Sequence, residues 1–531
     1  MLSDKKFEEI FPLDKPRDGQ REIIESIISA YQSGKKYVIL DAPTGIGKSV
    51  IGYSIARYFG EAYILTSQKI LQDQYFKDFK IPFILGRANY TCRKNNNFTC
   101  DMGACFRNPK SYCKDSNGIY TCPYLIDKEI CLRNNYSNLN YSYFLSITKF
   151  GKLEPRKLII CDESHGLESE LIRQCSIKIT EKSLTFNGIM NEKLPMISDS
   201  DGNKCNWLIN TILEKAKIEL ANVRLKVSKM NSMKMTREYK ILHSRFQNLE
   251  TLVISIETLK EQILNTTKGS KEQRIIITHT PEFIEFKPLY GINTFKSTIN
   301  KYGEFFLFMS ATILNKDVFC KNLGINPKDA EYIRCESTFP VKNRLINFNP
   351  VGSMSFKNKN TTMPLLIKEI DNILKKHPNV KGIIHTVNYE IAEKIIEGLS
   401  FSNQSSRLIY PVGADRQIML DTFYASKKPY VLISPSLMEG IDLKEDLSRL
   451  CIICKIPYLN LGDNWTKERM SIDPEWYTTM ACVHLIQMTG RSIRSETDYA
   501  ETYILDKDFL KLAHQSVNIF PKWWQDSVII N

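Results

Sequence analysis

The stretch Asp41-Ala42-Pro43-Thr44-Gly45-Ile46-Gly47-Lys48-Ser49 decides how this chain folds. It follows the apolar run Tyr37-Val38-Ile39-Leu40 and precedes a helix-like segment at residues 50–58. A strand, a glycine-containing loop and a helix in this order are the context that a phosphate-binding loop requires. The alternative is a strand-to-helix turn that binds nothing.

The residue types in this loop suit a nucleotide. Gly45 and Gly47 allow the backbone to curl so that its N–H groups face phosphate oxygens. Lys48 is placed to reach the β- and γ-phosphates, and Ser49 to ligate Mg²⁺. Ala42 stands where the usual motif has its first glycine, and a small residue is compatible with that position. The candidate nucleotide-binding residues of the loop are Ala42, Pro43, Thr44, Gly45, Ile46, Gly47, Lys48 and Ser49.

Apolar runs like the one before the loop recur along the chain. They do not alternate with polar residues, which suits central strands of a parallel sheet buried on both faces. Helix-like stretches separate them, so the sequence predicts an α/β fold built from βαβ units. The runs lie at residues 62–65, 158–161, 305–308, 382–385, 431–433 and 450–453.

The rhythm of strands breaks twice, at residues 86–140 and 167–300. Clustered cysteines and no strand-like run occupy residues 86–140, whereas the pattern of residues 167–300 is mainly helical. One helical face there is formed by Leu242, Phe246, Leu249, Val253, Ile256 and Leu259. We expect a first α/β domain with two insertions and a second α/β domain after Thr338-Phe339-Pro340. The expected boundaries are 1–85, 141–170 and 286–335 for the first domain, 86–140 and 171–285 for the insertions, and 336–531 for the second domain.

An acidic pair and two arginines complete the candidate catalytic set. Asp162 and Glu163 directly follow the run at residues 158–161, where an Asp can hold the water shell of a metal and a Glu can polarise an attacking water. Far downstream, Arg491 and Arg494 lie on one helical face, and Gln487 precedes them. Guanidinium groups can stabilise the charge that spreads over a γ-phosphate. A solvated loop and a surface charge patch are the alternative interpretations of these two motifs.

Composition and charge limit the class of protein. The chain has 531 residues, of which 43% are hydrophobic and 25% charged, as in globular domains rather than disordered or coiled-coil chains. A net charge of +13 fits a polyanionic partner, although solubility alone would account for part of it. No run of about 18 apolar residues is present and the N-terminus lacks an apolar core. We therefore expect no membrane span and an intracellular protein, cytoplasmic or in the nucleoid or nucleus, and not secreted.

Five of the 14 cysteines cluster: Cys92, Cys100, Cys105, Cys113 and Cys122. In a reducing compartment, clustered thiols indicate a metal site more than disulfides. Structural zinc sites use close pairs of ligands, which only Cys100 and Cys105 approach, and no histidine lies between Cys92 and Cys122. Widely spaced thiolates suit an iron–sulfur cluster. Zinc and free thiols remain the alternatives on this ground alone.

The motifs together resemble those of a superfamily 2 helicase, in which ATP binds between two RecA-like domains. Arg17 and Gln20 resemble the segment before the first strand, and residues 66–74 resemble the motif after the second strand. Ser310-Ala311-Thr312 matches the element that links hydrolysis to nucleic-acid binding. Residues 434–442 resemble the fifth motif, which adds Gly440 and Asp442 to the candidate nucleotide-binding residues.

The cysteine cluster narrows the resemblance to the XPD/DinG branch. Gly86-Arg87-Ala88-Asn89-Tyr90-Thr91-Cys92 and Cys122-Pro123-Tyr124 resemble the phrases that open and close a four-cysteine [4Fe–4S] domain in that branch. The resemblance implies Cys92 and Cys122 as ligands with Cys105 and Cys113 between them, and Cys100 as a substitute for either of the middle two. It also implies that the helical insertion forms an arch. Ser164 departs from the usual alanine of the acidic motif, and little effect is expected.

The resemblance implies a DEAH-type enzyme that binds ATP and Mg²⁺, moves 5′ to 3′ along single-stranded DNA and unwinds forked duplex DNA as a monomer. Two alternatives remain: an RNA or RNA/DNA-hybrid helicase, and a zinc-containing nucleic-acid-binding scaffold with an inactive motor. A basic stretch at residues 215–245 is either a groove wall along a phosphate backbone or a solvated helical face. Its basic residues are Lys215, Lys217, Arg224, Lys226, Lys229, Lys234, Arg237, Lys240 and Arg245.

Overall fold

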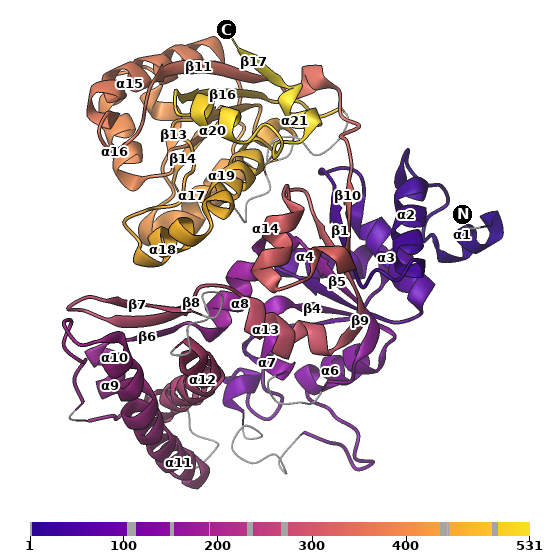
Figure 1. The fold of residues 1–531 in the computed structure, drawn as a ribbon, viewed down its shortest axis with the longest axis vertical. Helices are drawn as coiled ribbons and strands as arrows, with labels where there is room; N and C mark the ends of the chain where they lie inside the picture. The colour runs from indigo at the N-terminus through magenta and orange to yellow at the C-terminus, as the bar shows by residue number, and fades with distance from the viewer. Residues whose placement is uncertain are drawn as a thin grey trace.

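A computed structural model describes most of the chain. The described residues are 3–103, 113–148, 153–190, 192–230, 237–266, 274–435, 443, 445–490 and 497–530. Figure 1 shows two α/β units, the second domain (orange to yellow) above the first, with a helical insertion beside the first domain at the lower left. No helix of the described ranges is both long and apolar enough to cross a membrane.

The first domain is built on a seven-stranded sheet in which every pairing is parallel. The strand order is β10-β1-β9-β5-β2-β4-β3, and the strands β1 and β2 are buried along their whole length. In that order the strands span Ala330–Arg334, Tyr37–Asp41, Gly303–Ser310, Arg156–Asp162, Ala62–Thr66, Tyr136–Asn140 and Phe83–Ile84. This burial explains why the strand residues are apolar without alternation.

Helices cover both faces of this sheet and form two separate cores. Apolar side chains of α1 (Asp4–Ile10), α2 (Gln20–Gln32) and α3 (Lys48–Phe59) pack on one face. The other face is covered by α6 (Pro123–Arg133), α7 (Tyr141–Thr148), α13 (Ile292–Ser297) and α14 (Lys316–Leu323). A further helix, α4 (Lys69–Phe79), contacts strands β2, β3 and β4.

The second domain repeats the architecture. Its seven strands are also all parallel, in the order β13-β14-β12-β15-β16-β11-β17. They span Leu408–Ile409, Val431–Ser434, Gly382–His385, Leu450–Ile453, Glu501–Asp506, Ile346–Gly352 and Val528–Ile530. The helices α15 to α21 span Lys359–Lys376, Tyr389–Gly398, Arg416–Ala425, Asn464–Ile472, Pro474–Thr489, Phe509–Gln515 and Lys522–Gln525. Two parallel-sheet α/β domains are therefore confirmed.

The prediction that residues 86–140 contain no strand is wrong at their end. Strand β4 pairs with β2 and β3 and so belongs to the sheet of the first domain. Its sequence, Tyr136-Ser137-Asn138-Leu139-Asn140, gives no apolar run because two fully buried positions are polar. The Ser137 hydroxyl donates to the Cys131 carbonyl, and Thr66 Oγ1 donates to Asn138 Oδ1 over 3.4 Å. Hydrogen bonds thus replace the apolar signature in this strand.

The helical insertion carries its own core and a small sheet. Its helices are α8 (Leu167–Cys175), α9 (Glu181–Phe186), α10 (Asp201–Asn206), α11 (Leu213–Lys229) and α12 (Arg237–Thr266), with a π-helix at Trp207–Ile212. The amphipathic face expected of α12 packs in this core. The three-stranded antiparallel sheet at its base was not expected: β6 (Ile177–Ile179), β8 (Ile284–Pro288) and β7 (Ile275–His279).

The described part of the cysteine segment (residues 86–122), at residues 98–102, docks against this insertion. The Tyr239 hydroxyl on α12 donates to the Met102 carbonyl over 2.8 Å, and His243 Nε2 lies 3.0 Å from the Asp101 carbonyl. Phe98 packs edge-on against Tyr239, with the two ring centroids 5.8 Å apart. The two insertions into the first domain are therefore in direct contact.

Arg469 on α18 joins the second domain to the base of the helical insertion. Its guanidinium is fully buried, donates to the Leu289 carbonyl and pairs with Glu168 on α8 over 3.0 Å. The same group donates to Asn322 Oδ1 on α14 over 2.5 Å and lies 3.6 Å from the centre of the Tyr290 ring. One side chain thus holds the second domain against both the first domain and its insertion.

Candidate functional site

The predicted phosphate-binding loop connects β1 to α3. The Ala42 N–H donates to the Ser310 carbonyl of β9 over 2.9 Å, which fixes the start of the loop. Gly45 and Gly47 have φ values of +92° and +84°, in the left-handed region that residues with a Cβ disfavour. Gly47 directly precedes the first residue of α3, Lys48. The loop therefore curls at the two glycines that the sequence singled out.

Arg17 and Gln20 brace this loop. Arg17 Nη1 donates to the Gly45 carbonyl over 2.6 Å, and Gln20 Nε2 donates to the Ile46 carbonyl over 2.7 Å. A Cβ at Gly47 would lie 2.5 Å from Gln20 Nε2, so the glycine also makes room for this contact. Both predicted residues are therefore brought to the loop, where they hold its backbone.

Lys48 folds back over the loop. Its Nζ donates to the carbonyl oxygens of Ala42 at 3.1 Å and Pro43 at 3.5 Å. These partners are neutral, and a phosphate would give the ammonium group a stronger, charge-assisted hydrogen bond.

The acidic pair lies at the carboxyl end of β5. Asp162 is buried, and its Oδ2 accepts a 3.0 Å hydrogen bond from the Tyr75 hydroxyl, which Ser49 also contacts. Burial, and then the neighbouring charge of Glu163, raise the pKa of Asp162 to about 6, although the positive charge of Lys48 lowers it. Ser49 and Asp162, the two candidate Mg²⁺ residues, thus share one tyrosine.

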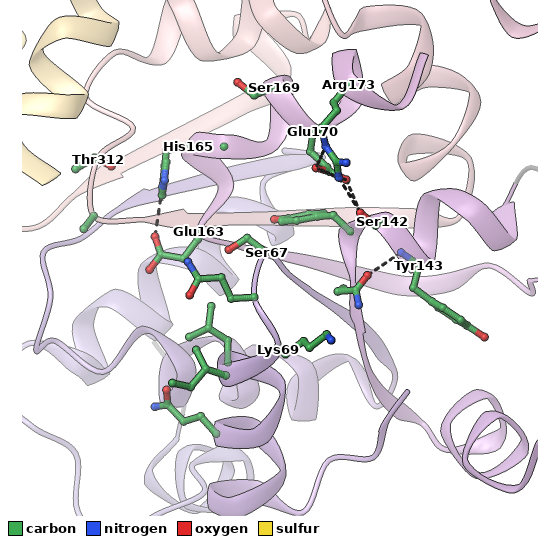
Figure 2. Close-up of a pocket in the computed structure, with 18 of the residues that line it drawn as sticks. Ser67, Lys69, Ser142, Tyr143, Glu163, His165, Ser169, Glu170, Arg173 and Thr312 are labelled. Atoms are coloured by element: carbon green, nitrogen blue, oxygen red, sulfur yellow. Dashed lines mark hydrogen bonds and ion pairs between the residues drawn. The ribbon is translucent and has the colours of Figure 1, made fainter. Parts of the chain in front are cut away.

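A chain of polar contacts leads from Glu163 to the second domain. His165 Nδ1 lies 3.3 Å from Glu163 Oε2 and 2.8 Å from Ser310 Oγ, and the Thr312 N–H donates to that same Ser310 oxygen over 3.2 Å. Gln487 Nε2 on α19 then donates to Thr312 Oγ1 over 3.3 Å. Figure 2 shows Glu163, His165 and Thr312 on one side of the cleft. The candidate base of the first domain is therefore linked to a predicted residue of the second domain.

A cleft of about 1470 Å³ opens between the two domains at this chain of contacts. Thr44 and Glu163 line its nucleotide side, and Gln487 and Trp523 line it from the second domain. Lys69, which Figure 2 labels, and Arg87 of the cysteine segment also line it. Its cationic and aromatic lining includes Lys69, Arg87, Tyr124, Lys128, Tyr141, Tyr143, His165, Arg173 and His484.

Several predicted residues lie outside the described ranges. They are Gly440, Asp442, Arg491, Arg494 and Cys105. Helix α19 ends at Thr489, shortly before the two arginines in sequence. Their roles remain predictions.

The other clustered cysteines are buried but do not all meet. Cys100 Sγ lies 3.4 Å from Cys122 Sγ, and both pack in one apolar cluster with Cys113. Cys92 packs with the helical insertion instead. Within the described ranges, no group of three or more Cys, His, Asp or Glu side chains is placed to hold a metal ion. The described thiols therefore fit part of a four-thiolate ligand set, and they bring Cys100 next to Cys122.

Part of the basic stretch of the helical insertion is paired internally. Lys215 contacts Glu192, Lys217 lies 3.2 Å from Glu257, and Arg245 forms an ion pair with Glu219. Arg224 lies over the Phe246 ring, 5.7 Å from its centre. These contacts favour a solvated helical face over a groove wall for this part of the stretch.

The sequence did not single out three residues that position the acidic pair. They are Tyr75, Tyr141 and His165, and Tyr141 donates to the backbone carbonyl of Asp162 over 2.9 Å. Tyr75 and Tyr141 have no sequence signal, because tyrosine on a helix is ordinarily a packing residue. His165 had one, since it ends the acidic motif Asp162-Glu163-Ser164-His165. In this motif the Ser164 hydroxyl donates to the Met309 carbonyl over 3.2 Å, so the unusual serine is accommodated.

Comparisons with known proteins agree with this arrangement. Residues 370–527 match the helicase C-terminal domain family, and residues 13–188 match the family described as the type III restriction enzyme res subunit. The chain is 23% identical to a probable ATP-dependent helicase of Methanocaldococcus jannaschii, over 94% of this chain and 93% of the relative. It is 21% identical to the ATP-dependent DNA helicase YoaA of Haemophilus influenzae, over 93% of this chain and 91% of the relative.

Solved structures show the same fold. An XPD helicase superposes with a TM-score of 0.65 at 16% identity, covering 98% of this chain and 100% of the other. Xpd4 of S. tokodaii superposes with a TM-score of 0.60 at 15% identity, covering 97% of this chain and 100% of the other.

Proposed function

We propose, from the premise that this chain belongs to the XPD/DinG family of superfamily 2 helicases, that it is an ATP-dependent DNA helicase of the DEAH type. It moves 5′ to 3′ along single-stranded DNA as a monomer and unwinds forked duplexes. One observation carries the proposal: a chain of contacts from Glu163 to Gln487 crosses the cleft between the two domains. It runs through His165, Ser310 and Thr312. A hydrolytic group in one domain thereby has a mechanical path to the other.

The nucleotide is held by the first domain. Lys48 exchanges its carbonyl partners for the β- and γ-phosphates, and the curled backbone at Gly45 and Gly47 turns N–H groups towards them. Ser49 and Asp162 hold Mg²⁺, which neutralises phosphate charge when bound. The shared Tyr75 hydroxyl keeps these two side chains in register.

Glu163 is the group that accepts the proton of the attacking water. His165 orients its carboxylate, and Ser310 in turn orients His165. From the second domain, Gln487 positions water, while Arg491 and Arg494 stabilise the charge on the γ-phosphate. The Oε1 atom of Gln487 is buried with no hydrogen-bond partner among the described residues, so one acceptor of this amide is unused.

Single-stranded DNA follows the cleft. A groove with cations for the backbone and aromatic rings for the bases binds single strands with little regard to sequence. Lys69, Lys128 and Arg173 line the cleft as cations, whereas the Tyr124 and Tyr143 rings that also line it are buried and shape its wall. The Tyr124 and Tyr143 hydroxyls lie 3.0 Å apart, which fixes their rings as a pair.

The cysteine segment holds a [4Fe–4S] cluster. The contact between Cys100 and Cys122 supports Cys100 as a ligand, in place of Cys105 or Cys113, beside Cys92 and Cys122. The cluster would tie together a segment with little apolar core. Cys122→Ser should remove the visible absorbance and about half or more of the iron per chain, and Cys131→Ser should leave both unchanged, because the Cys131 thiol on α6 contacts the Asn138 carbonyl of β4. A colourless wild-type protein containing zinc would contradict the assignment.

Strand displacement tests the proposed activity. Duplexes with a 5′ tail and duplexes with a 3′ tail are incubated with ATP and Mg²⁺, and only the 5′-tailed substrate should be unwound. Stimulation of ATP hydrolysis by single-stranded DNA is compared with stimulation by single-stranded RNA. Unwinding from the 3′ tail would overturn the polarity, stronger stimulation by RNA would favour an RNA helicase, and no hydrolysis with either polymer would leave a binding scaffold.

A further inference from the structure

Helix α14 is the surface on which the second domain sits. Figure 1 shows it between the two domains, directly after β9. Asn315, the residue that caps its N-terminus, donates to Glu475 over 2.7 Å, and Lys321 pairs with Asp473 over 2.9 Å. Contacts from both ends of α14 therefore reach the second domain.

Leu314, just before this helix, crosses the domain boundary. Its side chain is 3% exposed and packs in the apolar core of the second domain, although it belongs to the chain of the first. The neighbouring Ile313 packs in the core of the first domain. Two consecutive side chains thus insert into opposite domains.

The backbone at Leu314 is held in an uncommon conformation. Its φ is +62°, in the left-handed region that a residue with a Cβ adopts only when its surroundings enforce it. Asp41 supplies that constraint, because its carboxylate accepts the N–H groups of Ile313 and Leu314, each over 3.2 Å. Arg334 donates to the Leu314 carbonyl from the other side.

Asp41 is also the last residue before the phosphate-binding loop. Its side chain is buried and accepts a 2.7 Å hydrogen bond from Tyr332 as well as a 3.3 Å contact from Arg334. Burial raises the pKa of Asp41, while the Tyr332 hydroxyl and the Arg334 guanidinium lower it. A shift of the loop at Asp41 is therefore carried to the Leu314 backbone through hydrogen bonds in a buried site.

We propose that Leu314 is the positioning residue through which the phosphate-binding loop controls the seating of the second domain. We call Leu314 the plug: Asp41 fixes its backbone conformation through hydrogen bonds, and its side chain packs in the core of the second domain. The inference rests on the proposed function and assigns a residue that does not line the cleft. Because α14 begins two residues later, a shift of the Leu314 backbone also moves the contacts that α14 makes with the second domain.

The test compares Leu314→Ala with Ile313→Ala, an adjacent truncation that removes apolar atoms from the first domain only. Leu314→Ala should keep its KM for ATP and its ATP hydrolysis without DNA, yet lose about tenfold in base pairs unwound per ATP, within the usual range of coupling between sites. Ile313→Ala should keep the wild-type ratio of unwinding to hydrolysis. Leu314→Met, which nearly conserves the side-chain volume, should keep the wild-type number of base pairs unwound per ATP.

A further readout needs no catalysis. In hydrogen exchange on the full chain without nucleotide, Leu314→Ala should speed exchange of the α14 and α19 peptides, and Ile313→Ala should not affect α19. Unchanged unwinding per ATP in Leu314→Ala, or the same loss in Ile313→Ala, would overturn the plug. If the wild-type protein hydrolyses no ATP, the proposed function fails, and the exchange of α19 alone then supports or overturns the plug.

Discussion

The two domains repeat one unit, a central strand followed by a loop and a helix, and they use it differently. In the first domain β1 leads through the glycines 45 and 47 into α3, and no side chain of the described residues caps that helix. In the second domain β12 leads into α16, where Asn388 caps the helix by accepting the Glu390 N–H over 2.7 Å. The same architecture thus leaves one helix N-terminus for a ligand and closes the other with its own side chain.

The backbones of the two loops agree with this division. Gly45 and Gly47 take left-handed conformations without steric cost, whereas the second domain places Val387, a β-branched residue, at φ +62°. The loop of the second domain is therefore a fixed structural turn, and only that of the first offers a cradle of backbone N–H groups. A parallel sheet by itself does not bind nucleotide; the loop at its carboxyl edge decides.

The largest expected effect comes from the uncapped N-terminus of α3. Lys48→Ala removes the ammonium group at the phosphates, so ATP hydrolysis should fall by at least about a hundredfold, as for other lost charge-stabilising groups. Phosphate release with single-stranded DNA measures it, and circular dichroism should show an unchanged fold. Hydrolysis near the wild-type rate would mean that the nucleotide binds elsewhere.

The next effect separates binding from hydrolysis within the first domain. Glu163→Gln keeps the size of the side chain but cannot accept a proton, so kcat should fall about a hundredfold while a fluorescent nucleotide binds as before. Glu170→Gln is the matched control, since Glu170 lines the same cleft but pairs with Arg173. Equal losses in both variants would argue that the cleft tolerates no change rather than that Glu163 is the base.

The third effect is a pH dependence of Mg²⁺-ATP binding at the first domain. The β12–α16 unit of the second domain should show none. The pKa of Asp162 is raised to about 6, so this carboxyl is protonated below that pH and cannot hold Mg²⁺. Affinity for Mg²⁺-ATP should therefore fall by about tenfold per pH unit as the pH drops below 6, one proton competing with one metal. Calorimetric titration from acid to neutral pH measures it, and Asp162→Asn should bind weakly with no such slope.

The same carboxyl has the opposite influence on stability. A folded-state pKa above the unfolded value means that the folded protein binds the proton more tightly, so this contribution to stability is present at low pH and is lost as pH rises through about 6. Asp162→Asn should thus raise the melting temperature at neutral pH and not near pH 4, where about half of the unfolded carboxyls are protonated.

The smallest effect comes from the N-terminus of α16, which Asn388 caps. Asn388→Ala removes the cap of α16, which should lower the free energy of unfolding by about 1 kcal/mol and leave ATP hydrolysis unchanged. Thermal unfolding and phosphate release measure the two quantities. A loss of hydrolysis here would show that the N-terminus of α16 also serves the reaction, and the contrast between the two domains would fail.

Much of this could be predicted because local chemistry enforced it. The buried parallel strands required unbroken apolar runs, and the phosphate-binding loop required glycine at its two left-handed positions. Strand β4 escaped because hydrogen bonds to Ser137 and Asn138 replaced apolar burial. A buried strand can be predicted from an apolar run only where apolar side chains fill its buried positions.

The parts of the site that escaped depend on contacts between distant residues. Tyr75 reaches Asp162 from a separate helix, and Leu314 enters the second domain from the first. Neither residue type is unusual at its place in sequence, so no local pattern marks it. The 3.4 Å contact between the Cys100 and Cys122 sulfurs is of the same kind, because spacing along the chain does not fix which thiols meet.

Arg469 limits how the cleft can open. Drawing α18 away from the base of the helical insertion would leave this fully buried guanidinium without Glu168, and breaking a buried pair of this kind costs about 3–5 kcal/mol. If the cleft between the domains opens at the end of α19 near Gln487 while the Arg469 contacts are kept, that penalty is avoided. The buried contacts of Arg469, with Glu168 and with Asn322 on α14 of the first domain, therefore oppose opening at α18 and favour opening near Gln487.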